Sequence, residues 1–232
     1  MKTLRSTIGP VRNRPYFTRD EIERLCTDEL KALDLFPKEP QPIRIERFVE
    51  KRFGPVSYQD LPESIMGFTR FGRDGVEKIV VARSLIDAGR ASSERRANTT
   101  LAHEAGHGLL HSHLFALETP PPSLFGPDNA EPMRILCRDD AFTHQRLRYD
   151  GRWWEFQANQ VIGALLLPAT LVQECISDYL EGRGLLGMKV LPARRREAAA
   201  IRVSEVFDVN PVVARIRLEQ LFPVGDESQL TL

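Results

Sequence analysis

Residues 100–111 read T-L-A-H-E-A-G-H-G-L-L-H, with two histidines four positions apart and a glutamate directly after the first. On a helix, residues four apart project from the same face, one turn above the other. The imidazoles of His103 and His107 could therefore bind one zinc ion, and Glu104 would lie beside the metal, where it can take a proton from water. The H-E-x-x-H pattern predicts a metal-binding helix that carries its own general base.

The distribution of histidines favours this interpretation over an ordinary surface helix. The chain has five histidines, and His103, His107, His111 and His113 all fall within one short segment. The preceding Thr-Thr-Leu-Ala suits a buried helix, and Gly106 leaves room for a neighbouring backbone or a substrate. The alternative is a solvated helix that happens to bear two histidines, and the clustering makes it the weaker interpretation.

A catalytic zinc site has three protein ligands and one open position, so a third ligand is needed. His111 lies one turn beyond His107, but three ligands on one helix would strain tetrahedral geometry. Glu155 leads an apolar helix, where a metal would give its charge a partner. A first-turn glutamate that interacts with the helix dipole is equally ordinary. The residue types leave six candidates open: Glu155, Gln157, Asp178, Glu181, His144 and His111.

A second segment, residues 155–168, reads E-F-Q-A-N-Q-V-I-G-A-L-L-L-P. Together with residues 100–111 it resembles the ImmA/IrrE family of metallopeptidases. That family pairs an H-E-x-G-H helix ending in L-L-H with a later helix of the form E-x-x-A-N/D ending in L-L-M-P. The resemblance implies zinc as the cofactor, His103, His107 and Glu155 as its ligands, and Glu104 as the general base.

The same resemblance implies a zinc endopeptidase that cleaves a regulatory protein, a DNA-binding repressor in the most concrete version. Residues 199–221 are also similar to the C-terminal segment of the family. The chain departs from the family in its long Pro-rich segment 117–150, which could cover the cleft, select substrate or supply contacts of its own. An oxyanion donor is expected as well, and the sequence does not rank its candidates: Tyr58, His111, His144 and Tyr149.

The alternative function is a non-enzymatic, zinc-containing transcriptional regulator or stress sensor. A fourth ligand from residues 117–150, such as Cys137 or His144, would close the zinc site and make it structural. The C-terminal helices would then bind DNA or a transcription factor, with residues 209–211 as the turn of a helix-turn-helix. A basic cluster precedes these helices and is more often a solvated helix start: Arg194, Arg195 and Arg196.

The local patterns predict an α+β fold, with a mainly helical, zincin-like metallopeptidase core and a small antiparallel β-sheet before the active-site helix. Thr18 and Glu21 form a capping box that opens a helix to about residue 36. Asp-Gly at residues 74–75 predicts a hairpin between strands 65–71 and 76–81. The remaining predictions are a short strand over 43–45 and helices over 46–53, 92–116, 153–167, 169–180, 193–207 and 211–221.

We expect four parts along the chain. They are a loose N-terminal arm over residues 1–17, a core over 18–181 with the Pro-rich insertion 117–150, a C-terminal helical segment over 182–222 and a tail over 223–232. A core of this length needs no disulfides or structural metal to be stable.

Composition excludes several other classes of protein. The 232 residues include 32 basic and 32 acidic side chains, so bulk charge does not attract the chain to nucleic acid or to anionic membranes. Three cysteines without a C-x-x-C pair do not form a disulfide scaffold or a zinc ribbon. The start of the chain has no signal-peptide pattern, and the longest apolar run, residues 161–167, is too short to span a membrane. We therefore expect a cytoplasmic protein.

Overall fold

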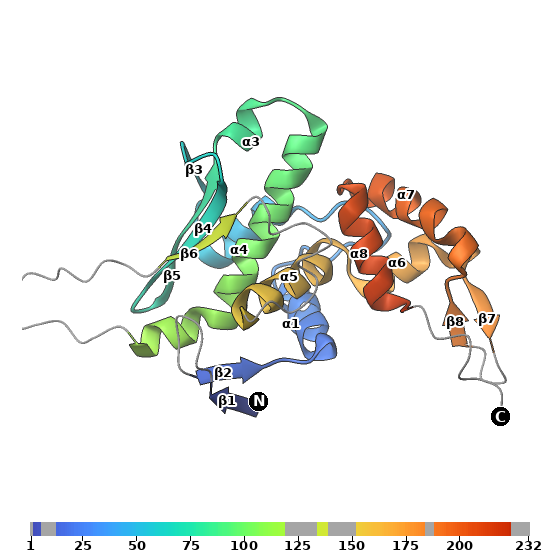
Figure 1. Ribbon diagram of the computed structural model, residues 1–232, viewed down its shortest axis with the longest axis horizontal. Helices are drawn as coiled ribbons and strands as arrows, with labels where there is room; N and C mark the ends of the chain where they lie inside the picture. Colours follow the sequence, from blue (N-terminus) through green and yellow to red (C-terminus); the bar gives the residue numbers. More distant parts are fainter. Residues whose placement is uncertain (1, 6–12, 119–133, 139–151, 184–187, 224–232) are drawn as a thin grey trace, which may run out of the picture.

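The computed structural model describes residues 2–5, 13–118, 134–138, 152–183 and 188–223 (Figure 1). Within these ranges the fold is α+β and mainly helical, as predicted, with a small sheet packed against one long helix, α4 (Ala91–Glu118). A second apolar helix, α5 (Trp153–Leu166), also packs along α4. None of the described helices is long and apolar enough to cross a membrane.

The sheet is mixed and has the strand order β3-β5-β4-β6. Its hairpin, β4 (Ile65–Gly72) and β5 (Gly75–Ala82), is the predicted one, and Gly75 closes the turn with a φ of 113°. The prediction of an antiparallel sheet is wrong for one pair, because β3 (Ser57–Gln59) runs parallel to β5. The chain reverses direction between β3 and β4 and again between β4 and β5. β3 and β5 therefore run in the same direction, and they are neighbours in the sheet.

Part of the segment 117–150 contributes to this sheet. α4 continues to Glu118, and β6 (Arg134–Arg138) pairs antiparallel with β4 at the sheet edge. Residues 119–133 and 139–151 lie outside the described ranges. Within the described residues, β6 connects this segment to the core, which the high proline content of the segment did not predict.

The central part of α4 is buried because the sheet, α2 (Ile45–Phe53) and α5 cover different sides of it. Gly106 allows α5 to approach α4 closely. A Cβ atom at this position would lie 3.0 Å from Val161 Cβ and 3.1 Å from Ala158 Cα, both on α5. Two helices that cross this closely bring the first turn of α5 beside the histidine-bearing face of α4.

Two parts of the predicted N-terminal arm, residues 2–5 and 13–16, are described as strands. β1 (Lys2–Arg5) and β2 (Asn13–Tyr16) form an antiparallel pair. Pro15 in β2 is buried, and its carbonyl oxygen accepts a hydrogen bond of 2.8 Å from Gln157 Nε2 on α5. Proline fits here because β2 is an edge strand and can lack an N–H donor. The hairpin is therefore attached to the helix core by a backbone acceptor.

α1 (Arg19–Ala32) begins at the predicted capping box. Thr18 Oγ1 accepts a hydrogen bond from the Glu21 N–H at 3.2 Å, and Glu21 Oε2 accepts one from the Thr18 N–H at 2.7 Å. The buried face of α1 consists of Ile22, Cys26 and Leu30. The helix ends earlier than predicted, before the left-handed Asp34 at φ 56°.

The predicted strand over residues 43–45 is wrong. Ile45 is the first residue of α2, and its N–H donates to the Ile43 carbonyl at 2.8 Å, so the chain turns where an extended strand was expected. Ile43 and Ile45 are both buried. The pattern apolar-polar-apolar fits a tight turn at the start of a helix as well as it fits a strand. The end of α2 at Gly54, with a φ of 95°, is as predicted.

The C-terminal part of the described chain is helical with one small hairpin. α6 (Ala169–Cys175) ends before its predicted boundary and is followed by a 3-10 turn, Ser177–Tyr179. A second 3-10 turn, Ala193–Arg195, precedes α7 (Arg196–Phe207). α8 (Pro211–Leu221) has its predicted bounds and packs on α7. The other elements are β7 (Glu181–Arg183), β8 (Met188–Val190) and the short α3 (Ser84–Asp87).

Arg217 connects α8 to the rest of the core. It is 5% exposed, its Nε donates to the Leu167 carbonyl at 2.9 Å, and its Nη2 pairs with Glu23 on α1. Phe207 of α7 is buried, whereas Ile201 is 47% exposed and does not belong to the core. The inner face of α7 is formed instead by Ala199, Ala200, Val203, Ser204 and Phe207.

Candidate metal centre

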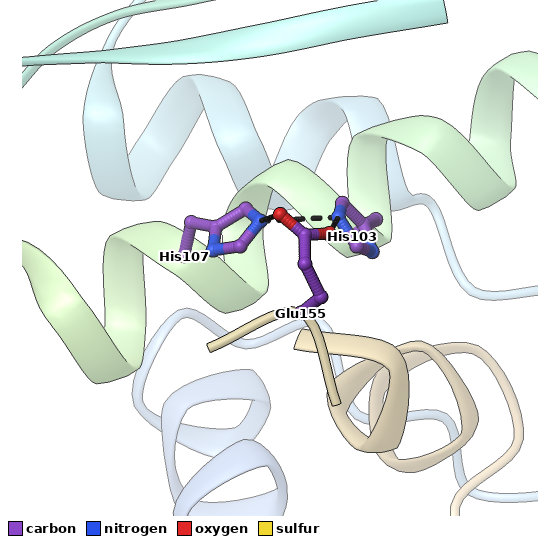
Figure 2. Close-up of side chains that lie close together, drawn as sticks. All are labelled: His103, His107 and Glu155. Carbon is purple, nitrogen blue, oxygen red and sulfur yellow. Dashed lines mark hydrogen bonds and ion pairs between the residues drawn. The ribbon is translucent and has the colours of Figure 1, made fainter. Parts of the chain in front are cut away.

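The structure brings together two histidines of α4 and the first-turn glutamate of α5 (Figure 2). The Nε2 atoms of His103 and His107 are 3.0 Å apart. One carboxylate oxygen of Glu155 lies 3.2 Å from His103 Nε2, and the other lies 3.8 Å from His107 Nε2. Figure 2 shows the carboxylate reaching from α5 between the two imidazoles. These three residues are the only group in the described part of the chain that could hold a metal ion.

These separations fit a divalent metal ion. Two ligands bound at 2.0–2.1 Å in tetrahedral geometry are about 3.3 Å apart, and the three measured distances bracket that value. Both imidazoles are fully buried, and the Glu155 side chain is 13% exposed. Since the described group has three members, one tetrahedral position is left for water or substrate.

The electrostatics of the group favour a positive charge at the same place. Burial lowers the pKa of His103, but the Glu155 and Glu104 carboxylates and the Asn159 side chain raise it, and the net direction is upward. Burial and the neighbouring imidazoles hold the pKa of His107 well below its ordinary value. The surroundings of His103 therefore favour positive charge beside the Glu155 carboxylate, which is also what a bound dication would supply.

The other ring nitrogens of the two histidines also have partners. His103 Nδ1 lies 3.0 Å from Asn159 Oδ1, and His107 Nδ1 lies 3.1 Å from His111 Nδ1. Burial lowers the pKa of His111 to about 4, so this ring is neutral at pH 7. Metal-binding histidines usually have such a partner on the nitrogen that faces away from the metal. His111 was one of the candidate metal ligands by sequence. In the structure it contacts His107 and is not one of the three grouped residues.

Glu104 lies on the sheet side of α4 and is fully buried. Its Oε2 accepts a hydrogen bond of 2.6 Å from Thr69 Oγ1 on β4, and its Oε1 has no hydrogen-bond partner in the described structure. Burial raises the pKa of Glu104 to about 8, against the lowering effects of His103 and Thr69. In its ionised form, which a bound cation would favour, this carboxyl group has one unused oxygen with which to accept a proton from water and return it.

Three contacts around the site were missed in the sequence. Asn159 belongs to the E-x-x-A-N pattern, and its position one turn after Glu155 was a usable signal for a residue on the same helix face. Gln157 was considered as a ligand, but it contacts His111 Nε2 through its Oε1 at 3.0 Å. Thr69 gave only a faint signal, as a fully buried polar residue in an apolar strand.

The remaining candidates are not brought to the metal centre by any described contact. The Tyr58 hydroxyl donates to Glu46 Oε1 at 2.6 Å, and burial raises the pKa of Tyr58. Glu181 pairs with Arg194, and the Asp178 carbonyl accepts from Arg195. His144 and Tyr149 lie outside the described residues, and the side chain of Cys137 in β6 does as well.

The predicted basic cluster has intramolecular partners. Arg194 Nη2 lies 2.7 Å from Glu181 Oε1, Arg195 Nη1 donates to the Asp178 carbonyl at 3.1 Å, and Arg196 Nη2 donates to the Phe222 carbonyl. These contacts join the β7 hairpin and the end of α8 to the start of α7. In the described structure these three arginines therefore contact other C-terminal elements of the same chain.

Comparison with known proteins adds no assignment: no family model matches the chain, and no curated protein matches it. The interpretation of the site therefore depends on its own geometry.

Proposed function

We propose that this protein is a zinc-dependent endopeptidase with a zincin-like active site. The observation that carries the proposal is the convergence of His103, His107 and Glu155, with their ligand atoms all within 4.8 Å of one another. The position of Glu104 supports hydrolysis, since a metal held only for structure needs no adjacent proton acceptor. Imidazole and carboxylate ligands suit zinc. The resemblance to the ImmA/IrrE metallopeptidases, carried by both ligand-bearing helices, supports the same choice.

Different residues of the chain have different roles in the proposed hydrolysis. When bound, zinc supplies Lewis acidity, which activates water and polarises a peptide carbonyl. Glu104 accepts the proton of the attacking water on its carboxylate and then delivers it to the leaving nitrogen. Thr69 donates to Glu104 Oε2, which leaves Oε1 for the proton transfer. Asn159 and His111 orient the two imidazoles.

We propose a regulatory, repressor-type protein as the substrate. The support is the family resemblance, in which cleavage of DNA-binding repressors is the characteristic reaction.

Two measurements test this proposal. Purified wild-type protein is expected to contain about one zinc ion per chain, and Glu155→Ala is expected to lose it, because a two-histidine site binds weakly. Glu174→Ala, at an exposed glutamate on α6, is the matched control. Zinc-loaded wild type should cleave a repressor encoded beside its gene, and Glu104→Gln should bind zinc without cleaving it. A wild type without zinc, or a Glu104→Gln variant that cleaves at the wild-type rate, would contradict the proposal.

A further inference from the structure

A chain of hydrogen bonds runs from His107 away from the metal centre to the N-terminal hairpin. His107 Nδ1 lies 3.1 Å from His111 Nδ1, and His111 Nε2 lies 3.0 Å from Gln157 Oε1. Gln157 Nε2 then donates to the Pro15 carbonyl oxygen at 2.8 Å. The chain joins α4, α5 and β2, and its members are buried.

The last link fixes the direction of the others. A carbonyl oxygen only accepts, so the NH₂ group of Gln157 must face Pro15 and its oxygen must face His111. His111 Nε2 must therefore carry a hydrogen. A doubly protonated ring would place a charge in the core with only an imidazole and an amide as hydrogen-bond partners, which is costly. His111 Nδ1 thus carries no hydrogen and accepts one from His107 Nδ1.

The opposite arrangement, in which His111 donates to His107, leaves one contact in this chain without a hydrogen, whichever way the Gln157 amide is turned. If His107 carried its hydrogen on Nε2, His111 Nδ1 would have to donate, and His111 Nε2 would become an acceptor. Turning the Gln157 amide to donate to that nitrogen would place its oxygen against the Pro15 carbonyl. Two buried acceptors would then face each other without a proton, which costs about 1–3 kcal/mol.

We infer that Gln157 and His111 are positioning residues that hold His107 with its hydrogen on Nδ1 and its Nε2 lone pair toward His103 and Glu155, where a metal ion binds. The Pro15 carbonyl is the fixed end of this device, so the N-terminal hairpin takes part in preparing the metal site. Trp153 restrains the middle of the chain, because its indole packs edge-on against the His111 ring with centroids 5.4 Å apart. The inference rests on the metal-binding part of the proposed function and not on peptidase activity.

This chain of hydrogen bonds also explains why His103 and His107 have different hydrogen-bond partners. Asn159 Oδ1 directly accepts from His103 Nδ1, so one amide oxygen is sufficient there. His107 lies one turn further along α4, and α5 reaches its Nδ1 only through the ring of His111. Each ligand therefore has an acceptor from α5, one direct and one relayed.

The first test uses the metal-free wild-type protein and nitrogen NMR, which distinguishes protonated from unprotonated ring nitrogens. We expect the hydrogen of His107 on Nδ1 and that of His111 on Nε2. A His111 ring protonated on Nδ1 would overturn the inference without any variant. This measurement is independent of peptidase activity, so a protein that cleaves nothing still gives a decisive result.

The second test is Gln157→Met, which keeps an unbranched side chain and loses both hydrogen bonds. We expect a mixture of His107 tautomers and zinc affinity about tenfold weaker by competition with a chelator. Gln160→Met is the matched control, because Gln160 is also buried on α5 and has no described contact with the histidines. Unchanged tautomers and affinity in Gln157→Met, or equal losses in both variants, would overturn the inference. His111→Gln, which can accept and donate in the same order, should retain more affinity than His111→Phe.

Discussion

The pKa of Glu104 has a consequence for stability that can be measured without knowing the substrate. Burial raises this pKa from 4.5 to about 8 in the metal-free protein. A carboxyl group with a raised folded-state pKa stabilises the fold below its unfolded pKa, and that contribution is lost as the pH rises toward the folded pKa. The metal-free protein should therefore lose stability between about pH 4.5 and pH 8 through this one residue.

The magnitude follows from the width of that window. Each pH unit between the two pKa values changes the free energy of unfolding by about 1.4 kcal/mol. Glutamine at position 104 does not titrate and keeps a similar shape. The stability of Glu104→Gln relative to wild type should therefore increase by about 3 kcal/mol between pH 5 and pH 7.5.

The assay is urea unfolding of both proteins in the presence of a chelator, at several pH values across this range. Taking the difference between the two proteins removes, to first order, the contributions of other titrating groups. Glu174→Gln, the same substitution at an exposed glutamate, is the control. A Glu104→Gln difference that stays constant within about 0.5 kcal/mol from pH 5 to 7.5 would refute the argument that burial holds a proton on Glu104.

Three further predictions concern the surroundings of the site. Thr69→Val removes the hydroxyl that lowers the pKa of Glu104. In this background the stability difference between the glutamate and glutamine proteins should therefore continue to grow to higher pH, and an unchanged profile would contradict the role of Thr69. Gly106→Ala places a Cβ 3.0 Å from Val161 Cβ and should destabilise the fold by about 1–3 kcal/mol in urea unfolding, whereas a neutral effect would mean that α4 and α5 can separate freely. Arg217→Met removes the buried partner of Glu23 and should cost about 3 kcal/mol, whereas Arg215→Met, whose pair with Glu197 is exposed, should have a much smaller effect. Equal effects would contradict the structural role of Arg217.

The parts of the fold that the sequence predicted are those encoded by nearby residues. The Thr18 capping box, the hairpin around residues 72–75 and the helical spacing of the H-E-x-x-H segment all depend on residues within a few positions of one another. Local patterns also gave the bounds of α8. The error at residues 43–45 shows the limit of such patterns, since three residues fit a turn and a strand equally well.

The features that the sequence did not predict depend on contacts between distant segments. The parallel pairing of β3 follows from which edge of the hairpin it occupies, and no residue within β3 specifies that. The hydrogen bond from Gln157 to Pro15 joins residues 142 positions apart. At the candidate metal centre, residue types and the family resemblance were sufficient to name His103, His107 and Glu155. The contact of Asn159 with His103 and that of Thr69 with Glu104 required the three-dimensional arrangement.

The most direct test of an open hydrolytic metal site is X-ray absorption spectroscopy of the zinc-loaded protein. The account predicts only nitrogen and oxygen ligands at about 2.0–2.1 Å, from two imidazoles, one carboxylate and water. In Glu104→Gln the same ligand set should persist. A sulfur ligand at about 2.3 Å, or four protein ligands without water, would indicate a closed structural site and contradict the proposed peptidase.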